Sequence, residues 1–195
     1  MIRYLLPLVL VLCCQADEKK PAAAGKNQLS AIAEKLLGKN GGDRLFYYPS
    51  KTAPDVPSKY GYRYADVNFK SEDGTKLHGW FLNPKLGVRS KGTIVFHHGN
   101  AGSVGYHITF VGWMVRAGYQ VLLYDYRGYG KSEGEITRKG LVQDARAAVN
   151  YVKTRKDVDS KRLISFGHSL GGAKSLAALG EKMIPGVCGV VSFAG

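Results

Sequence analysis

A short glycine-containing segment near the end of the sequence, GHSLG at residues 167–171, could supply a nucleophile. An apolar run at residues 163–166 precedes it, and a stretch of small residues with helical character follows it. A G-x-S-x-G motif between a strand and a helix holds its serine on a sharp turn with the hydroxyl exposed. A serine hydroxyl becomes an effective nucleophile when an adjacent base takes its proton. We therefore predict Ser169 as a catalytic nucleophile, with a purely structural turn as the alternative.

A second segment, HHGNAG at residues 97–102, follows the apolar run at residues 93–96 and could stabilise an oxyanion. Its glycines allow the backbone to turn so that an N–H group faces the nucleophile. We predict that the N–H groups of Asn100 and Leu170 form a two-donor oxyanion hole, with Ala101 as the substitute for Asn100. An ordinary glycine turn with two incidental histidines is the alternative.

Other chemistry is disfavoured by residue spacing. The segment DYRGYGKS at residues 125–132 has Asp125 and Glu133 where phosphate-binding loops require glycine. His97 and His98 are adjacent, so on a strand they point to opposite faces and do not share one metal ion. The sequence therefore indicates no cofactor and no metal. Asp125 precedes the serine, whereas a catalytic acid of this type of site follows it, so we predict a structural role for Asp125.

The elements that must position these residues alternate along the chain after an opening hairpin. Hydrophobic periodicity predicts strands at residues 64–69, 76–82, 93–96, 119–124, 163–166 and 187–193, and helices at 106–116, 137–153 and 170–183. Thr137 is a predicted N-cap, and the strand at 187–193, with Cys188 in it, is predicted to be buried. Strand–helix alternation predicts an α/β fold with a mainly parallel sheet and helices on both faces. In such sheets the chemistry lies beyond the carboxyl ends of the strands.

The composition is that of a globular protein, with 45% hydrophobic residues and a formal charge of +13. The lysines and arginines are scattered and form neither a basic helix face nor a zinc-finger pattern, so we expect no nucleic-acid partner.

The first sixteen residues have the features of a targeting segment. Arg3 supplies a positive charge, residues 5–12 are apolar, and Cys13 and Cys14 follow directly. Three alternatives stay open: a lipoprotein signal that anchors the chain to a membrane, cleavage after Ala16 with secretion or periplasmic release, and an uncleaved anchor. The predicted organisation is a leader at 1–16, a linker with a short helix at 17–60, and an α/β domain at 61–195.

Three motifs in consistent order, HHGNAG at 97–102, DYRGYGKSEG at 125–134 and GHSLGG at 167–172, resemble the α/β-hydrolase superfamily. The closest resemblance is to the Bem46-like (ABHD13-type) serine hydrolases, and it runs from about residue 45 to Gly195. Asp73-Gly74 and Gly79-Trp80 fit the opening hairpin of that group. The resemblance implies an α/β-hydrolase fold, a small-molecule acyl substrate and hydrolysis of an ester, thioester or amide.

The resemblance also implies features that this sequence does not contain. Members of the family have eight strands, with a catalytic acid after strand seven and a histidine after strand eight. Here six strands are predicted, and Glu181 is the only acidic or histidine residue after Ser169. We therefore expect strands one to six of a truncated hydrolase that is inactive alone, with an uncovered apolar edge at residues 187–193. The alternative is a non-catalytic binding protein, or a lipid-anchored protein, on a hydrolase-derived fold.

Overall fold

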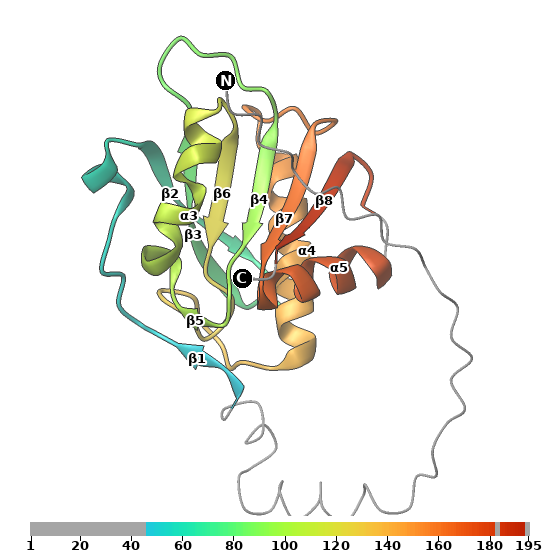
Figure 1. Cartoon of the computed structure of the whole chain (residues 1–195). Coiled ribbons are helices and arrows are strands. Elements are labelled where there is room, and N and C mark those ends of the chain that lie inside the picture. The colour runs from blue at the N-terminus through green and yellow to red at the C-terminus, as the bar shows by residue number, and fades with distance from the viewer. Residues whose placement is uncertain (1–45, 182–183, 194–195) are drawn as a thin grey trace, which may run out of the picture.

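A six-stranded sheet with helices on both faces organises the chain in this computed structural model, which describes residues 46–181 and 184–193 (Figure 1). The strand order is β2-β3-β6-β4-β7-β8. The strands are β2 (Arg63–Lys70), β3 (Lys76–Asn83), β4 (Thr93–His97), β6 (Gln120–Tyr124), β7 (Leu163–His168) and β8 (Val187–Phe193). β3 runs antiparallel to β2 and β6, and the β6-β4-β7-β8 pairs are all parallel. The predicted fold class is thus confirmed.

The helices divide between the two faces of the sheet (Figure 1). They are α3 (Val104–Arg116), α4 (Arg138–Thr154) and α5 (Leu170–Glu181). On one face, apolar residues of α3 pack on β3, β4 and β6 in a core that contains Phe96 and Ile108. On the other face, α4 packs in a second core with Phe81 and Leu141. Because both faces are covered, the central strands β4 and β6 are buried at every position and mostly apolar, as buried parallel strands are.

The helix that follows the second motif begins at its predicted cap. The side-chain oxygen of Thr137 accepts a hydrogen bond from the Gly140 N–H at 2.9 Å, which satisfies one of the free donors in the first turn of α4. This bond fixes where α4 starts and confirms Thr137 as the N-cap.

The last strand corrects a prediction. β8 forms as expected, but it is an edge strand whose hydrogen-bonded neighbour among the described residues is β7. Val191 and Phe193 are 42% and 52% exposed, and Cys188 is also exposed. The prediction of a buried strand was wrong because an apolar run does not reveal whether a strand has neighbours on one side or both. The uncovered apolar edge that the family resemblance implied at residues 187–193 is what the structure shows for the residues that it describes.

The segment before the hairpin contacts the loops at the carboxyl edge of the sheet. A two-residue strand, β1 (Tyr48–Pro49), pairs in parallel with β5 (Ala101–Gly102), which lies within the first motif. The Ser50 N–H extends this pairing by donating to the Gly102 carbonyl at 2.8 Å. A 3-10 helix, η1 (Pro57–Tyr60), follows and leads into β2. The sequence had predicted only a linker for this part of the chain.

The leader at 1–16 and the helix predicted within 17–42 lie outside the described residues. Among residues 46–181 and 184–193, no helix is long and apolar enough to cross a membrane.

Candidate active site

Three loops meet where the central parallel strands end. In the register of the sheet, His97 of β4 lies opposite Gly167 of β7, and Phe96 lies opposite Leu123 of β6. The carboxyl ends of these strands are therefore level with one another. The motifs at 97–102, 125–134 and 167–172 all leave the sheet at this edge, which is where α/β proteins place their ligands.

Ser169 has the backbone of a nucleophile elbow. Its φ is +51°, and it is the only non-glycine residue of the described segments with a positive φ. Such a conformation costs free energy and persists where the surrounding structure imposes it. The Ser169 N–H donates to the Phe193 carbonyl at 2.7 Å, and its carbonyl accepts from the Gly172 N–H at 2.9 Å. The side chain is exposed at the N-terminus of α5, where the helix dipole is positive.

The glycines around Ser169 allow β7 and α5 to approach closely. A Cβ on Gly171 would overlap the carbonyl oxygen of His97, and a Cβ on Gly167 would overlap the backbone of Gly172. A Cβ on Gly172 would overlap the Ser192 hydroxyl. The tight turn that presents Ser169 is thus incompatible with a side chain at Gly167 or Gly171, where the overlap is with backbone, whereas a side chain at Gly172 would require the Ser192 hydroxyl to move.

Asn100, a predicted oxyanion residue, lies in a loop held by polar contacts. Its side-chain Nδ2 donates to the Phe46 carbonyl at 2.7 Å, and its own carbonyl accepts from the Tyr129 hydroxyl at 2.8 Å. These bonds use the amide side chain and the carbonyl, not the backbone N–H. Leu170, the other predicted donor, is the first residue of α5. The two residues thus lie on the two loops that form this edge, and their shared role stays a prediction.

His97 is a structural residue in the core. Its Nδ1 is 2.8 Å from the Tyr124 hydroxyl, and its Nε2 is 2.9 Å from the Ser165 hydroxyl. Burial lowers the pKa of His97 to about 3, so the ring is neutral at neutral pH. A neutral ring with both nitrogens engaged holds β4 to its neighbours β6 and β7.

The other histidines form an aromatic cluster that sequence reasoning missed. His98 stacks on His107 of α3, with ring centroids 5.0 Å apart, and His107 lies 6.2 Å from His168. His168 in turn packs against Phe110 and Phe193. The cluster fixes the side of the elbow that faces α3. No spacing rule connects residues 98, 107 and 168, so the sequence carried no signal for it.

Asp125 anchors the second loop to the first. Its carboxylate is fully buried, and Oδ1 accepts a hydrogen bond from the Val104 N–H, the first of α3, at 2.8 Å. Its Oδ2 lies 3.8 Å from Nδ1 of His78, a residue for which the sequence had suggested no role. A Cβ on Gly130 would overlap the same carboxylate. The predicted structural role of Asp125 is confirmed.

Arg127 is a second buried anchor in this loop, and no sequence pattern had singled it out. Its guanidinium donates to Asp144 of α4 at 2.8 Å and to Asp73 of the β2–β3 turn at 2.7 Å. The Arg127 hydrogen bonds hold the pKa of Asp73 at about 2. One side chain therefore joins the hairpin, the loop and α4 beneath the carboxyl edge.

The described residues contain no group of three or more His, Cys, Asp or Glu side chains arranged to hold a metal ion. What the edge does offer is a strained, exposed serine at a helix N-terminus beside two glycine-rich loops. Such an arrangement can present a hydroxyl to a carbonyl carbon and N–H groups to the resulting oxyanion.

Known proteins are similar to this chain in sequence. The family described as "Serine aminopeptidase, S33" matches residues 88–195. The protein YfhR of Escherichia coli K12 is 38% identical over 151 residues, which cover 75% of this chain and 51% of YfhR. The α/β-hydrolase domain-containing protein WAV2 of Arabidopsis thaliana is 37% identical over 138 residues, 67% of this chain and 44% of WAV2.

Solved structures are similar to this chain in fold. An esterase of Pyrococcus furiosus superposes with a TM-score of 0.64 and 28% identity, over 76% of this chain and 56% of the esterase. The chain spans about half the length of the curated relatives that it matches. Since the family match covers the strands, helices and loops that form the elbow, the chain belongs to the serine aminopeptidase (S33) family of α/β hydrolases.

Proposed function

We propose that the protein to which this chain belongs is a serine hydrolase that cleaves an ester, thioester or amide. The observation that carries the proposal is the positive φ of Ser169, because it places an exposed hydroxyl on a strained turn between β7 and α5. The esterase among its structural relatives supports acyl transfer as the reaction class.

In this mechanism the Ser169 oxygen attacks the carbonyl carbon, and a base takes the hydroxyl proton. The backbone N–H groups of Leu170 and Asn100 donate to the oxyanion that forms. The alcohol, thiol or amine then leaves with a proton from the same base, and water hydrolyses the acyl-enzyme. Substrate groups are bound at the carboxyl edge of the sheet, between the loop at 97–102 and the elbow.

The base and its orienting acid are not supplied by the residues that follow Ser169. Residues 170–195 contain no histidine and no aspartate, and Glu181 is their one carboxylate. His97 and His98 precede the serine and are kept neutral by burial within structural contacts. We therefore propose that the 195-residue chain is inactive alone and that a longer product of the gene provides the base and the acid.

A fluorophosphonate probe tests both parts of the proposal. We expect it to label the longer product at Ser169, and to label the 195-residue chain at least about 10³-fold more slowly, as when the base is removed from a serine triad. Ser169→Ala is expected to abolish labelling of the longer product. Equal labelling of Ser169→Ala would refute the assignment of the nucleophile, and equal rates for both lengths would refute the need for a further segment.

Within the superfamily, we infer that the chain belongs to the Bem46-like group. The motif order and the hairpin with Asp73-Gly74 and Gly79-Trp80 support this placement. Comparing acyl chain lengths across YfhR, WAV2 and the longer product of this gene would test it, since a shared group predicts overlapping preferences.

We further infer that residues 1–16 direct export, with Cys13 or Cys14 as a lipid attachment site. This inference rests on the sequence alone. Radiolabelled palmitate should be incorporated into the wild-type chain and not into Cys13→Ser/Cys14→Ser. Incorporation that persists in the double variant would remove the support for lipid anchoring.

A further inference from the structure

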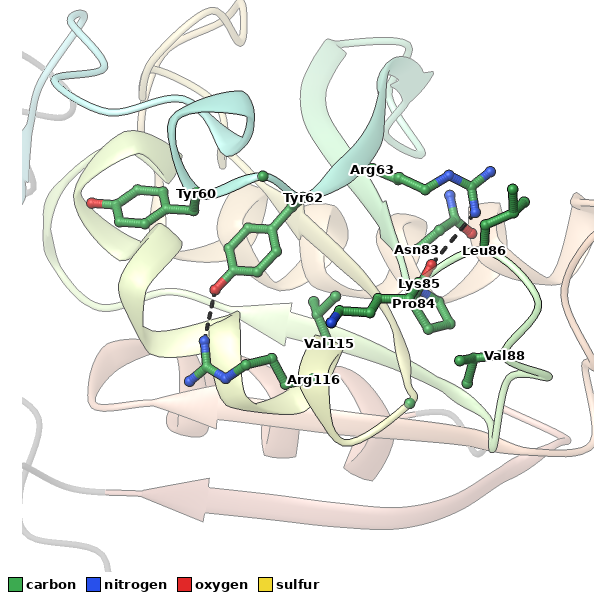
Figure 2. A pocket seen from close by; sticks show the side chains of 12 residues that line it. Tyr60, Tyr62, Arg63, Asn83, Pro84, Lys85, Leu86, Val88, Val115 and Arg116 are labelled. Carbon is green, nitrogen blue, oxygen red and sulfur yellow. Dashed lines mark hydrogen bonds between the residues drawn. The ribbon is translucent and has the colours of Figure 1, made fainter.

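A cavity of about 550 Å³ lies at the edge of the sheet opposite Ser169 (Figure 2). It is open to solvent on one side and is lined by the start of β2, the end of β3 and the C-terminus of α3. These segments border the amino ends of β4 and β6, whereas Ser169 follows the carboxyl end of β7. Five residues of strand separate the two edges, a distance of roughly 16 Å. The cavity is therefore distinct from the candidate active site.

The cavity has the size and lining of a ligand site. Its volume lies in the range of small-molecule pockets, which are mostly apolar with a few polar groups. Val115 and Pro84 are buried in its wall, and Leu86 and Val88 lie at its exposed rim. Tyr60 and Tyr62 are stacked with ring centroids 6.0 Å apart, and both belong to the lining.

The charges of the lining all have one sign. Arg63, Lys85 and Arg116 line the cavity, and its lining includes no aspartate or glutamate. Within residues 46–181 and 184–193, none of these three cations forms an ion pair with a carboxylate. The arginines instead donate to neutral oxygens. Arg116 Nη1 is 3.0 Å from the Tyr62 hydroxyl, and Arg63 Nη1 is 3.5 Å from the Pro84 carbonyl (Figure 2).

Unneutralised arginines beside an apolar wall favour one chemical class of ligand. A guanidinium binds carboxylate or phosphate oxygens through parallel charge-assisted hydrogen bonds. The apolar wall gains free energy when it is covered by hydrocarbon. We propose that this cavity is a second binding site, which takes an amphiphile with an anionic head and an unbranched apolar tail. Arg63, Lys85 and Arg116 supply the positive charge of the lining that attracts the head, and the tail lies against Val88 and Val115.

Titration calorimetry with decanoate, below its micellar concentration, tests the proposal on the 195-residue chain carrying Ser169→Ala. That background separates the site from any reaction at the elbow. We expect one decanoate per chain, with far weaker binding of acetate, which lacks the tail, and of decyl maltoside, which lacks the charge. Methyl resonances of Val88 and Val115 are expected to shift during the titration.

Surface variants locate the binding without disturbing the core. Arg63, Arg116 and Leu86 are all exposed, so Arg63→Gln/Arg116→Gln and Leu86→Asp should fold normally. We expect each to weaken decanoate binding at least about tenfold, because the first removes charge-assisted bonds and the second adds a repelling carboxylate. Lys139→Gln removes a charge from α4, outside this lining, and should change nothing. Absence of decanoate binding, equal affinity of the double variant, or equal binding of decyl maltoside would overturn the proposal.

Discussion

The backbone N–H of Ser169 donates to the carbonyl oxygen of Phe193 at 2.7 Å, so the elbow is tied to the end of the edge strand β8. This bond extends the β7–β8 pairing, in which His168 lies opposite Phe193. The strained φ of Ser169 is therefore maintained by the sheet on one side and by α5 on the other. The conformation that exposes the hydroxyl is a property of the fold, and it has a measurable cost.

Because of that cost, a substitution that relieves the strain at residue 169 should raise the free energy of unfolding, although it removes the hydroxyl. Glycine adopts a positive φ without the steric penalty of a side chain, so Ser169→Gly should raise the free energy of unfolding by about 1 kcal/mol. Ser169→Ala keeps the penalty and should leave stability within about 0.5 kcal/mol. Urea denaturation compares the two variants. A Ser169→Gly protein no more stable than Ser169→Ala would show that the turn is not strained.

Much of this architecture follows from sequence patterns that are local. The strand at 93–97, the helix capped by Thr137 and the elbow each depend on neighbours within a few residues, so periodicity and spacing revealed them. Because the carboxyl ends of parallel strands share one edge, the sequence also indicated that the loops at 97–102 and 167–172 would meet.

The features that were missed depend on contacts between distant segments. Arg127 and Asp73 are 54 residues apart in the sequence, and β1 pairs with a strand about fifty residues further along. The apolar run at 187–193 suggested a buried strand, and only the strand count of the resembling family indicated that this edge is uncovered, because exposure depends on what lies beside the sheet. Register and neighbours, rather than residue type, determine such features.

Gly171 of α5 lies so close to the His97 carbonyl that adding a single methyl group there should cause a large loss of stability. A methyl group there would overlap the His97 carbonyl, which is backbone and cannot rotate away, so Gly171→Ala should destabilise the fold by about 3 kcal/mol or more. Gly180 lies on the same helix, and a Cβ there would meet no atom within 4 Å, so it provides a matched control. Gly180→Ala should be neutral or stabilising by up to about 1 kcal/mol, since alanine favours helix. Similar denaturation midpoints for both variants would contradict the close packing of α5 on β4.

The Arg127 contacts predict that a positive charge without the guanidinium group cannot maintain the stability of the fold at this position. Lysine keeps the charge but cannot bond Asp144 and Asp73 together, and it leaves the fully buried Asp144 carboxylate short of partners. Arg127→Lys should therefore lower the free energy of unfolding by roughly 3 kcal/mol. Arg162 makes a comparable pair with Asp159, in which both side chains are 45% exposed, so Arg162→Lys should cost less than about 1 kcal/mol. Equal losses in chemical denaturation would show that the Arg127 network is not specific.

The buried histidines make stability depend on pH, and His78 opposes the others. Burial lowers the pKa of His97 to about 3 and of His98 to about 4, from 6.5. The unfolded chain therefore takes up protons below pH 6.5 that the folded chain does not. As a result, the free energy of unfolding decreases as the pH is lowered. For His78, burial favours a lower pKa, but the nearby Asp125 carboxylate and the hydrogen bond with Asp66 outweigh it and raise the pKa. Its contribution is largest at low pH and is lost as pH rises through the raised pKa.

The net effect between pH 7.5 and 5.5 is expected to be a loss of stability. At pH 5.5 each strongly depressed histidine costs about 1.4 kcal/mol relative to neutral pH, so His97 and His98 together outweigh the single opposing residue. His98→Asn removes one of the two groups and should reduce the difference in unfolding free energy between the two pH values by about 1.4 kcal/mol, whatever its effect on stability at pH 7.5. His78→Asn should increase that difference instead, because it removes the group of opposite sign. Urea unfolding at both pH values measures each difference, and an unchanged difference in His98→Asn would mean that His98 is not kept neutral by burial.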